Sequence, residues 1–312
     1  MRCLVTGGAG FIGHNLIRAL LDEGHTVRVL DNLSTGKRDN LGPFQDRIEL
    51  IEGDLRSYHI VHEAVRNIDV VFHQGALPSV PRSVKDPITT NQVNVEGTLN
   101  LLDAAQDTGV RRVVYASSSS IYGENDRLPK KEDMTPQPIS PYAVAKLAGE
   151  KYCQVFTRTY GLETVCLRYF NVFGPGQDPQ SEYSAVIPLF ITAFLEGRQI
   201  TVHGDGEQSR DFTYVDNVVN ANLLAAEAKD APGEVFNVAC GDRISLNQML
   251  DHLRTFTEVD VDVVYGDSRP GDVKHSMADI EGARKILGYE PLVSVAEGLR
   301  RSVEYYRTVQ QS

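Results

Sequence analysis

The segment that most constrains the fold is a glycine-rich turn near the start of the chain, Thr6-Gly7-Gly8-Ala9-Gly10-Phe11-Ile12-Gly13. It follows a short apolar run at residues 3–5, and apolar residues then recur at helical spacing over residues 12–21. Glycines let backbone N–H groups approach a phosphate, and the N-terminus of the following helix adds a favourable dipole. The order of strand, turn and helix predicts a dinucleotide pyrophosphate site with contacts from Gly7, Gly10, Phe11, Ile12 and Gly13.

An acidic residue ends the next predicted strand. The apolar run at residues 27–30 leads into Asp31, whose carboxylate can accept a hydrogen bond from a ribose hydroxyl. Asp31-Asn32 stands where the 2′-phosphate of NADP would have to lie, which favours NAD as the cofactor. Lys37 and Arg38 follow closely, so NADP stays open as the alternative.

Composition narrows the class of protein. The net charge of −11 over 312 residues argues against nucleic acid or an anionic membrane as a partner. The four cysteines lack metal-ligand spacing and the histidines form no metal motif, so we expect no metal site. The chain opens on a predicted strand, and its longest uncharged run, residues 183–195, is shorter than the ~20 residues of a membrane span. We therefore expect a cytoplasmic protein without a signal peptide or membrane segment.

Strands and helices alternate in the first half of the chain. The predicted strands are residues 2–5, 27–30, 48–51, 69–73, 112–116 and 164–168, and the clearest helices are 91–106 and 142–160. This alternation is typical of an α/β, Rossmann-like, doubly wound parallel sheet, which binds ligands at the carboxyl ends of its strands.

After Asn171 the sequence becomes richer in loops, with segments of glycine, proline and polar residues at 173–183, 204–210 and 267–274. Residues 215–227 and 235–238 are regular enough to return to the main sheet. We therefore predict an NAD-binding domain at 1–170 with returns at 212–239. A smaller, loop-rich substrate cap would comprise residues 171–211 and 240–312.

A tyrosine and a lysine, Tyr142 and Lys146, lie four residues apart on a predicted helix and so share one face. An ammonium group beside a phenol stabilises the phenolate and lowers the tyrosine pKa, which suits a general base. Such a pair also arises by chance, and the run Ser117–Ser120 after the fifth strand could be only a polar turn. Their common place at the carboxyl ends of strands favours a site.

The G-x-x-G-x-x-G spacing, together with Tyr142 and Lys146, resembles the extended branch of the short-chain dehydrogenase/reductase superfamily. Within that branch, residues 76–83 and 271–279 resemble the UDP-sugar 4-epimerases, and most closely those acting on UDP-N-acetylglucosamine. The resemblance implies that Ser118 hydrogen-bonds the reacting hydroxyl. Related dehydratases carry an Asp-Glu pair where this chain has Ser119-Ser120, so an elimination is disfavoured.

The resemblance also implies the remaining binding residues. Further cofactor contacts would come from Asn32, Ser34, Thr35, Gly36, Asp54, Leu55, Gln74, Ala76 and Tyr169. Substrate contacts would come from Ser79, Ser118, Ser120, Tyr142, Asn171, Gln177, Ala185, Val186, Thr201, Val202, His203, Arg210, Arg269, Asp272 and Ser276.

Three of these positions, Arg210, Arg269 and Ser276, bear on the identity of the substrate. The forked donors of Arg210 and Arg269 suit a diphosphate, although an isolated arginine is as often a surface residue. Family enzymes set the width of the sugar pocket at the position of Ser276, where a tyrosine crowds out an N-acetyl group and a small residue admits it. Pro78 departs from the glycine that the N-acetyl enzymes carry at its position.

The reaction implied is transient oxidation at C4, with Tyr142 taking the proton of the 4-hydroxyl, hydride passing to NAD, and the 4-keto sugar turning before reduction. UDP-GlcNAc/UDP-GalNAc would be the main pair and UDP-Glc/UDP-Gal a further one. A UDP-glucuronate epimerase or decarboxylase and a non-catalytic NAD-sensing protein remain the alternatives. By analogy the chain would form a homodimer through helices 91–106 and 142–160.

Overall fold

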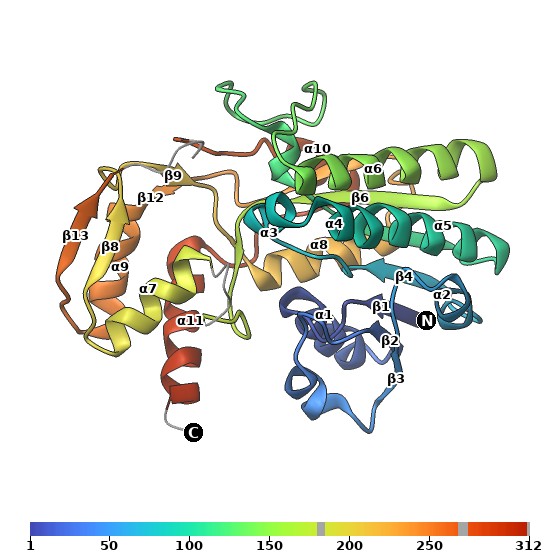
Figure 1. Ribbon diagram of the computed structural model, residues 1–312, viewed down its shortest axis with the longest axis horizontal. Coiled ribbons are helices and arrows are strands. Elements are labelled where there is room, and N and C mark those ends of the chain that lie inside the picture. Colours follow the sequence, from blue (N-terminus) through green and yellow to red (C-terminus); the bar gives the residue numbers. More distant parts are fainter. Residues whose placement is uncertain (180–184, 268–273, 311–312) are drawn as a thin grey trace.

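The structure is a computed structural model that describes residues 1–179, 185–267 and 274–310. Its centre is a parallel sheet of seven strands in the order β11-β6-β5-β4-β1-β2-β3 (Figure 1). The chain reverses its direction of travel across the sheet between β1 and β4, which creates a crevice at the carboxyl ends of these strands. The strands are β1 (Arg2–Thr6), β2 (Thr26–Asp31), β3 (Ile48–Glu52), β4 (Val70–His73), β5 (Arg112–Ser118), β6 (Glu163–Tyr169) and β11 (Val235–Val238).

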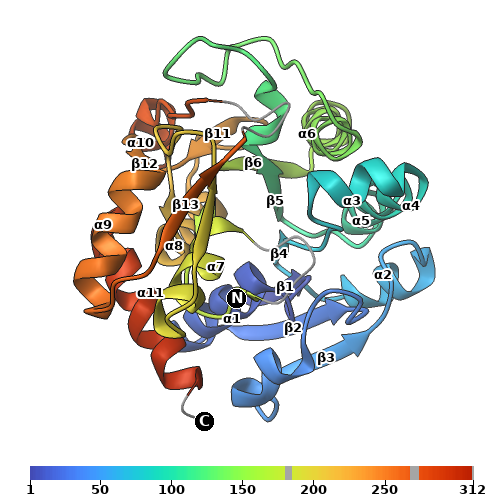
Figure 2. The same cartoon turned by 60° about the vertical axis from the view of Figure 1, so that its left-hand side comes forward.

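Helices cover both faces of the sheet because its central strands are apolar on both sides. Leu4, Val71 and Val113 pack on one face against α2, α5 and α6, whereas Val5, Phe72 and Val114 pack on the other face with α1 and α8. Figure 2 shows these two layers on opposite sides of the strands. The helices are α1 (Phe11–Asp22), α2 (Tyr58–Ala64), α3 (Val80–Lys85), α4 (Pro87–Asn91), α5 (Gly97–Asp107), α6 (Pro141–Tyr160) and α8 (Val215–Glu227).

A smaller layer lies beyond the carboxyl ends of the strands, at the left of Figure 1. Its helices α7, α9 and α11 pack on one another, and short strand pairs β8–β13 and β9–β12 flank them. This part comprises β7 (Val172–Phe173), α7 (Val186–Leu195), β8 (Ile200–His203), β9 (Ser209–Arg210), β10 (Thr213–Tyr214), β12 (Ile244–Ser245), α9 (Leu246–Thr257), β13 (Val263–Gly266) and α11 (Val295–Gln310). The remaining helix, α10 (Glu281–Leu287), packs on β11 and α8 of the main sheet.

The predicted fold class is confirmed, and each predicted strand lies within two residues of an observed one. The helix predicted for residues 91–106 is part of a longer helical run from α4 through one π-helical turn, η2 (Gln92–Glu96), into α5. Short 3₁₀ turns occur at η1 (Arg38–Phe44) and η3 (Ser119–Tyr122). Residues 235–238 do return to the sheet, as β11 beside β6, while the division into two domains stays a prediction. Among the described residues, no helix has the length and apolar character needed to cross a bilayer.

Candidate active site

The glycine turn forms a tight cradle at the end of β1. Gly7 has φ +68°, and a Cβ there would lie 2.7 Å from the backbone of Gly75. A Cβ on Gly13 would lie 2.2 Å from the carbonyl oxygen of Gly7, so neither position accepts a side chain without a shift. Gly10 is the N-cap of α1 and no side chain caps it, which leaves the first-turn N–H groups available to an anion. This cradle fits a pyrophosphate.

Asp31 lies beside this cradle at the end of β2. Its buried carboxylate accepts hydrogen bonds from the backbone N–H of Ala9 at 2.9 Å and of Leu33 at 2.8 Å. Each carboxylate oxygen has a further lone pair that a ribose hydroxyl can use. Hydrogen bonding thus connects Asp31 to the glycine turn, so the residues for the ribose and those for the pyrophosphate are held next to each other.

Basic residues beside Asp31 are paired with acids. Lys37 lies 2.8 Å from Asp178, and Arg38 pairs with Glu52. Arg56 contacts Asp54 at 2.8 Å, and this hydrogen-bonded ion pair holds the pKa of the Asp54 carboxyl well below its usual range. Because these cations already pair with acids, little positive charge is left to bind the 2′-phosphate of NADP. NAD is therefore favoured over NADP.

A cavity of about 430 Å³ opens at the same end of the sheet. Its lining includes Asn32 and Ser34, two of the residues expected to contact the cofactor, together with Arg56, Leu77 and Arg82. Asn94 fixes one wall, because its side chain both accepts from the N–H of Leu77 at 2.7 Å and donates to its carbonyl at 3.0 Å. No local sequence pattern predicted this role for Asn94.

Ser118, Tyr142 and Lys146 meet at the carboxyl end of β5. Ser118 ends the strand, and its side chain interacts with Tyr142 in the first turn of α6, which Ser140 caps by accepting from the Ala143 N–H at 3.2 Å. The Lys146 Nζ lies 5.9 Å from the centre of the Tyr142 ring and donates to the carbonyl of Ala116 at 2.8 Å. The structure therefore brings the three predicted catalytic residues together.

The electrostatics of this trio differ from the expectation. Burial raises the pKa of Tyr142, and the hydrogen bond from Ser118 offsets only part of that rise. Burial also lowers the pKa of Lys146 to about 8. The net direction is therefore opposite to the expected lowering of the Tyr142 pKa, because desolvation of the phenol outweighs the interactions that favour its phenolate.

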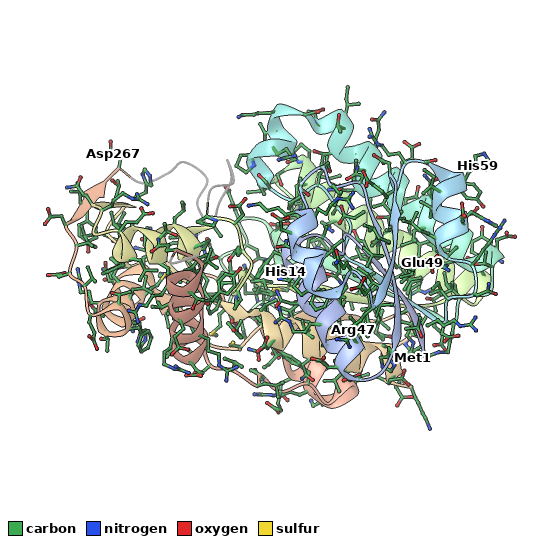
Figure 3. The ribbon with its side chains drawn as sticks, turned by 90° about the horizontal axis from the view of Figure 1, so that it is seen from below. Met1, His14, Arg47, Glu49, His59 and Asp267 are labelled. Atoms are coloured by element: carbon green, nitrogen blue, oxygen red, sulfur yellow. The ribbon has the colours of Figure 1, made fainter. Side chains whose placement is uncertain are left out.

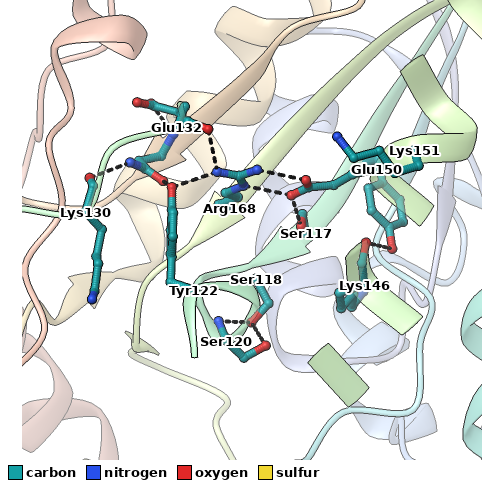
Figure 4. A network of polar contacts seen from close by, with 12 residues as sticks. Ser117, Ser118, Ser120, Tyr122, Lys130, Glu132, Lys146, Glu150, Lys151 and Arg168 are labelled. Atoms are coloured by element: carbon teal, nitrogen blue, oxygen red, sulfur yellow. Dashed lines mark hydrogen bonds and ion pairs between the residues drawn. The ribbon is translucent and has the colours of Figure 1, made fainter. Parts of the chain in front are cut away.

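A buried ion pair between Arg168 and Glu150 lies next to the segments that carry Ser118 and Lys146 (Figure 4). Arg168 donates two hydrogen bonds of 2.9 Å to Glu150, and Ser117 donates to the same carboxylate at 2.6 Å. Glu150 lies one helical turn after Lys146, and Ser117 directly precedes Ser118. Arg168 is 3 % exposed, so it does not extend to solvent as an isolated strand-end arginine would. Sequence reasoning missed Glu150, although a carboxylate on the sheet-facing side of a helix was a usable signal.

Residues that follow β6 face the crevice. The Tyr169 hydroxyl accepts from Asn222 at 2.8 Å and lies 3.2 Å from the Gln74 amide oxygen, so Gln74 and Tyr169 do come together. Asn171 has φ +35° and donates to the carbonyl of Asp211 at 2.9 Å. The Gln177 Oε1 is buried and has no hydrogen-bond partner among the described residues, which suits an acceptor for a ligand hydroxyl.

The loop that carries Gln177 packs on the cofactor side of the molecule. Pro175 accepts a 3.2 Å hydrogen bond from Asn15, and Gly176 packs so close to the His14 ring that a Cβ there would lie 2.4 Å from it. In Figure 3 His14 lies between the cap, marked by Asp267, and the opposite side of the molecule, marked by His59. The loop therefore joins the glycine-turn helix to the cap.

The cap places the other expected substrate residues. Arg210 in β9 donates to the carbonyls of Ser209 and Lys274, at 3.0 and 3.1 Å. Val202 is 1 % exposed, so its side chain belongs to the cap core and only its backbone can reach a ligand. The remaining residues lie in exposed or half-buried positions on loops and element ends: Ser79, Ser120, Ala185, Val186, Thr201, His203 and Ser276. Arg269 and Asp272 lie outside the described residues.

Comparisons with known proteins agree with this geometry. Residues 3–239 match the NAD dependent epimerase/dehydratase family. The chain belongs to this family. It is similar to the UDP-glucose 4-epimerase of Thermotoga maritima, solved with UDP-glucose, at 40% identity and a TM-score of 0.94, covering 99% of this chain and 100% of that one.

Two further structures show the range of substrates among its relatives. The UDP-N-acetylglucosamine 4-epimerase of Methanobrevibacter ruminantium is 42% identical with a TM-score of 0.94, covering 100% of this chain and 99% of that one. A UDP-glucuronic acid 4-epimerase of Bacillus cereus, solved with UDP-glucuronic acid and NAD, is 34% identical with a TM-score of 0.90, covering 99% and 100%. The chain is thus an isomerase of the UDP-sugar 4-epimerase group that uses NAD.

Proposed function

We propose that this epimerase interconverts UDP-GlcNAc and UDP-GalNAc, with UDP-Glc and UDP-Gal as a second pair. The observation that carries the choice is the small side chain of Ser276, in a position where a bulky residue would exclude an N-acetyl group. Its backbone N–H donates to the carbonyl of Ser209 at 3.0 Å, which sets it beside Arg210, the proposed diphosphate ligand. The similarity to a UDP-N-acetylglucosamine 4-epimerase supports the same substrate.

The cofactor would lie along the crevice from the glycine turn to Lys146. The cradle of Gly7, Gly10 and Gly13 would hold the pyrophosphate, and Asp31 would accept from the adenosine ribose. Bound NAD would supply the hydride acceptor for C4 of the sugar and return the hydride to the other face. The remaining contacts are proposed for Phe11, Ile12, Asn32, Ser34, Thr35, Gly36, Asp54, Leu55, Gln74, Ala76 and Tyr169.

The chain's own chemistry is proton transfer at the sugar 4-hydroxyl. Tyr142 Oη would take this proton and later give one back, while the Ser118 hydroxyl orients the alcohol by hydrogen bonding. Because burial raises the pKa of Tyr142, an added positive charge is needed to favour the phenolate. Lys146, held by the Ala116 carbonyl, supplies part of that charge beneath the ring.

The residues of the site favour this proposal over two other functions, that of a UDP-glucuronate enzyme and that of an NAD-sensing protein. A UDP-glucuronate enzyme would need a cation for the sugar carboxylate, and among the residues that the structure describes we assign none at the sugar end of the site. A purely NAD-sensing protein has no need to keep Ser118, Tyr142 and Lys146 in contact.

An assay on the protein as purified tests the proposal. UDP-GlcNAc, UDP-Glc and UDP-GlcA are each incubated with it without added NAD, and the products are resolved by NMR. We expect the C4 epimer of UDP-GlcNAc to form fastest. Turnover of UDP-GlcA alone would contradict the substrate, and unchanged sugars with tightly bound NAD would favour the sensor.

We also propose that the protein forms a homodimer through the two helices predicted for this role, residues 91–106 and 142–160, together with α4, which continues into the first of them. These helices pack side by side, and they expose apolar side chains: Ile88 is 71 % exposed, Val144 53 % and Val155 49 %. A second copy would cover this apolar surface. Analytical ultracentrifugation should give a dimer for the unsubstituted protein and a monomer for Ile88→Lys/Val144→Lys, and an unchanged mass would contradict this interface.

A further inference from the structure

Residues 274–279, which we name the bridging segment, link the cap to the main sheet. On the cap side, Ser209 donates its N–H to the carbonyl of Lys274 and its carbonyl accepts from the N–H of Ser276, both at 3.0 Å. On the sheet side, Lys130 donates to the carbonyl of Met277 and accepts from the N–H of Asp279, both at 2.8 Å. Ser276 is therefore placed by two sets of backbone hydrogen bonds from different parts of the fold.

Asn237 holds the sheet side of the bridging segment. It is fully buried on β11, and its side-chain amide donates to the carbonyls of Lys130 at 2.9 Å and Asp279 at 3.0 Å. Its amide oxygen accepts from the Tyr122 hydroxyl at 2.7 Å. The Asn237 side chain is thus hydrogen-bonded to both segments that meet here, the loop at Lys130 and the bridging segment.

Tyr122 connects Asn237 to the catalytic strand. It lies in the turn that follows Ser118, is 1 % exposed, and accepts a 2.8 Å hydrogen bond from Arg168. Arg168 in turn holds Glu150, which accepts from Ser117. Figure 4 shows this continuous path of polar contacts from Ser117 through Glu150 and Arg168 to Tyr122 and the loop carrying Lys130 and Glu132.

We infer that Tyr122 and Asn237 are positioning residues that set the width of the sugar pocket, by fixing the bridging segment relative to the end of β5. This inference rests on the proposed function. The size of Ser276 alone does not define the pocket, because the room for an N-acetyl group depends on where the bridging segment lies with respect to Ser118 and Tyr142. A fully hydrogen-bonded buried network allows little freedom in that distance.

The Tyr122 hydroxyl is the link that can be removed with least disturbance. Tyr122→Phe keeps the ring that packs on Phe170, with ring centroids 6.1 Å apart, and leaves the ion pair of Arg168 with Glu150 intact. It leaves the Asn237 amide oxygen without its 2.7 Å donor. The Asn237 side chain thereby loses one of its three hydrogen bonds, and the bridging segment loses its link through Tyr122 to Arg168, while the hydrogen bonds of Lys130 to Met277 and Asp279 remain.

Tyr289→Phe is the matched control. Tyr289 is also fully buried, and its hydroxyl donates to the carbonyl of Ala239 at 2.8 Å rather than to Asn237. Tyr122→Phe also removes an acceptor of the buried Arg168 guanidinium, whereas Tyr289→Phe removes one hydrogen bond to a carbonyl, so we expect the larger loss of Tm in Tyr122→Phe. Kinetics are therefore compared well below both Tm values, where a difference in the ratio of kcat/KM for the two sugars reports position and not general weakening of the fold.

The experiment measures Tm, kcat and KM for UDP-GlcNAc and UDP-Glc, and the Kd of both nucleotides, in the unsubstituted enzyme and both variants. We expect Tyr122→Phe to change the ratio of kcat/KM for the two sugars by about fivefold, mainly through KM, whereas Tyr289→Phe leaves it unchanged. An unchanged ratio in Tyr122→Phe, or the same change in both variants, would overturn the positioning role. An unsubstituted enzyme that epimerises neither sugar would contradict the proposed function, and the ratio of Kd values would still decide the positioning role.

Discussion

Removing the charge of Arg168 should destabilise the fold far more than an ordinary arginine substitution. Arg168 makes two hydrogen bonds of 2.9 Å to Glu150, one of 2.8 Å to Tyr122 and one of 3.2 Å to the Glu132 carbonyl. In Arg168→Met the carboxylate of Glu150, which is 0 % exposed, keeps Ser117 as its partner but loses its cation. An unpaired buried charge costs about 3–5 kcal/mol. That is a large part of the ~5–15 kcal/mol that stabilises a typical domain.

Arg112→Met provides the comparison within the same sheet. Arg112 is as buried as Arg168, each being 3 % exposed, but the side chain of its acid partner Glu163 is 39 % exposed. Water can therefore solvate Glu163 when the arginine is removed, so we expect a smaller loss of about 1–3 kcal/mol. In Arg168→Met/Glu150→Gln the unpaired charge is gone, and the two substitutions should be less than additive by about 1–3 kcal/mol.

Urea unfolding followed by far-UV circular dichroism measures these free energies, since the chain has no tryptophan to report by fluorescence. Equal losses of unfolding free energy in Arg168→Met and Arg112→Met would refute the reasoning.

Three further outcomes are expected. Tyr142→Phe should lower kcat by about 10²–10⁴-fold with unchanged Tm and NAD content. As a control, Tyr160→Phe at the exposed end of the same helix should retain full activity. Equal rates in the two variants would exclude Tyr142 as the base. Ser276→Tyr should spare UDP-Glc turnover and reduce UDP-GlcNAc turnover, and an equal loss on both would argue against the pocket assignment. Burial raises the pKa of Asp211 to about 7, above its value in the unfolded chain, so its contribution to stability is present in acid and is lost as pH rises through about 7. The unfolding free energy of Asp211→Asn should lack that part of the pH dependence, and parallel pH profiles would contradict it.

The predicted parts of the site share one property, which is that local sequence order fixes them. The glycine turn, the acid after β2 and the pair Tyr142–Lys146 each depend on a strand end or one helical turn, and periodicity locates both. What escaped prediction are polar groups inside the fold, such as Asn94, Glu150 and Asn237. The partners lie 17 residues away for Asn94 and 115 for Asn237 with Tyr122, so no local pattern identifies these two, whereas the place of Glu150 on the sheet-facing side of a helix was a usable signal.

The sequence by itself determined the parallel α/β fold, because alternating apolar runs and amphipathic helices can bury their surfaces in few other ways. It also determined the location of the site at the carboxyl ends of the strands. Only the tertiary structure decided the directions in which the pKa values of Tyr142 and Lys146 shift, since burial causes both shifts and depends on segments that are distant in the sequence. Tertiary structure likewise tied the bridging segment to the catalytic strand through Asn237 and Tyr122, because hydrogen bonds between remote residues exist only once the sheet and the cap have assembled.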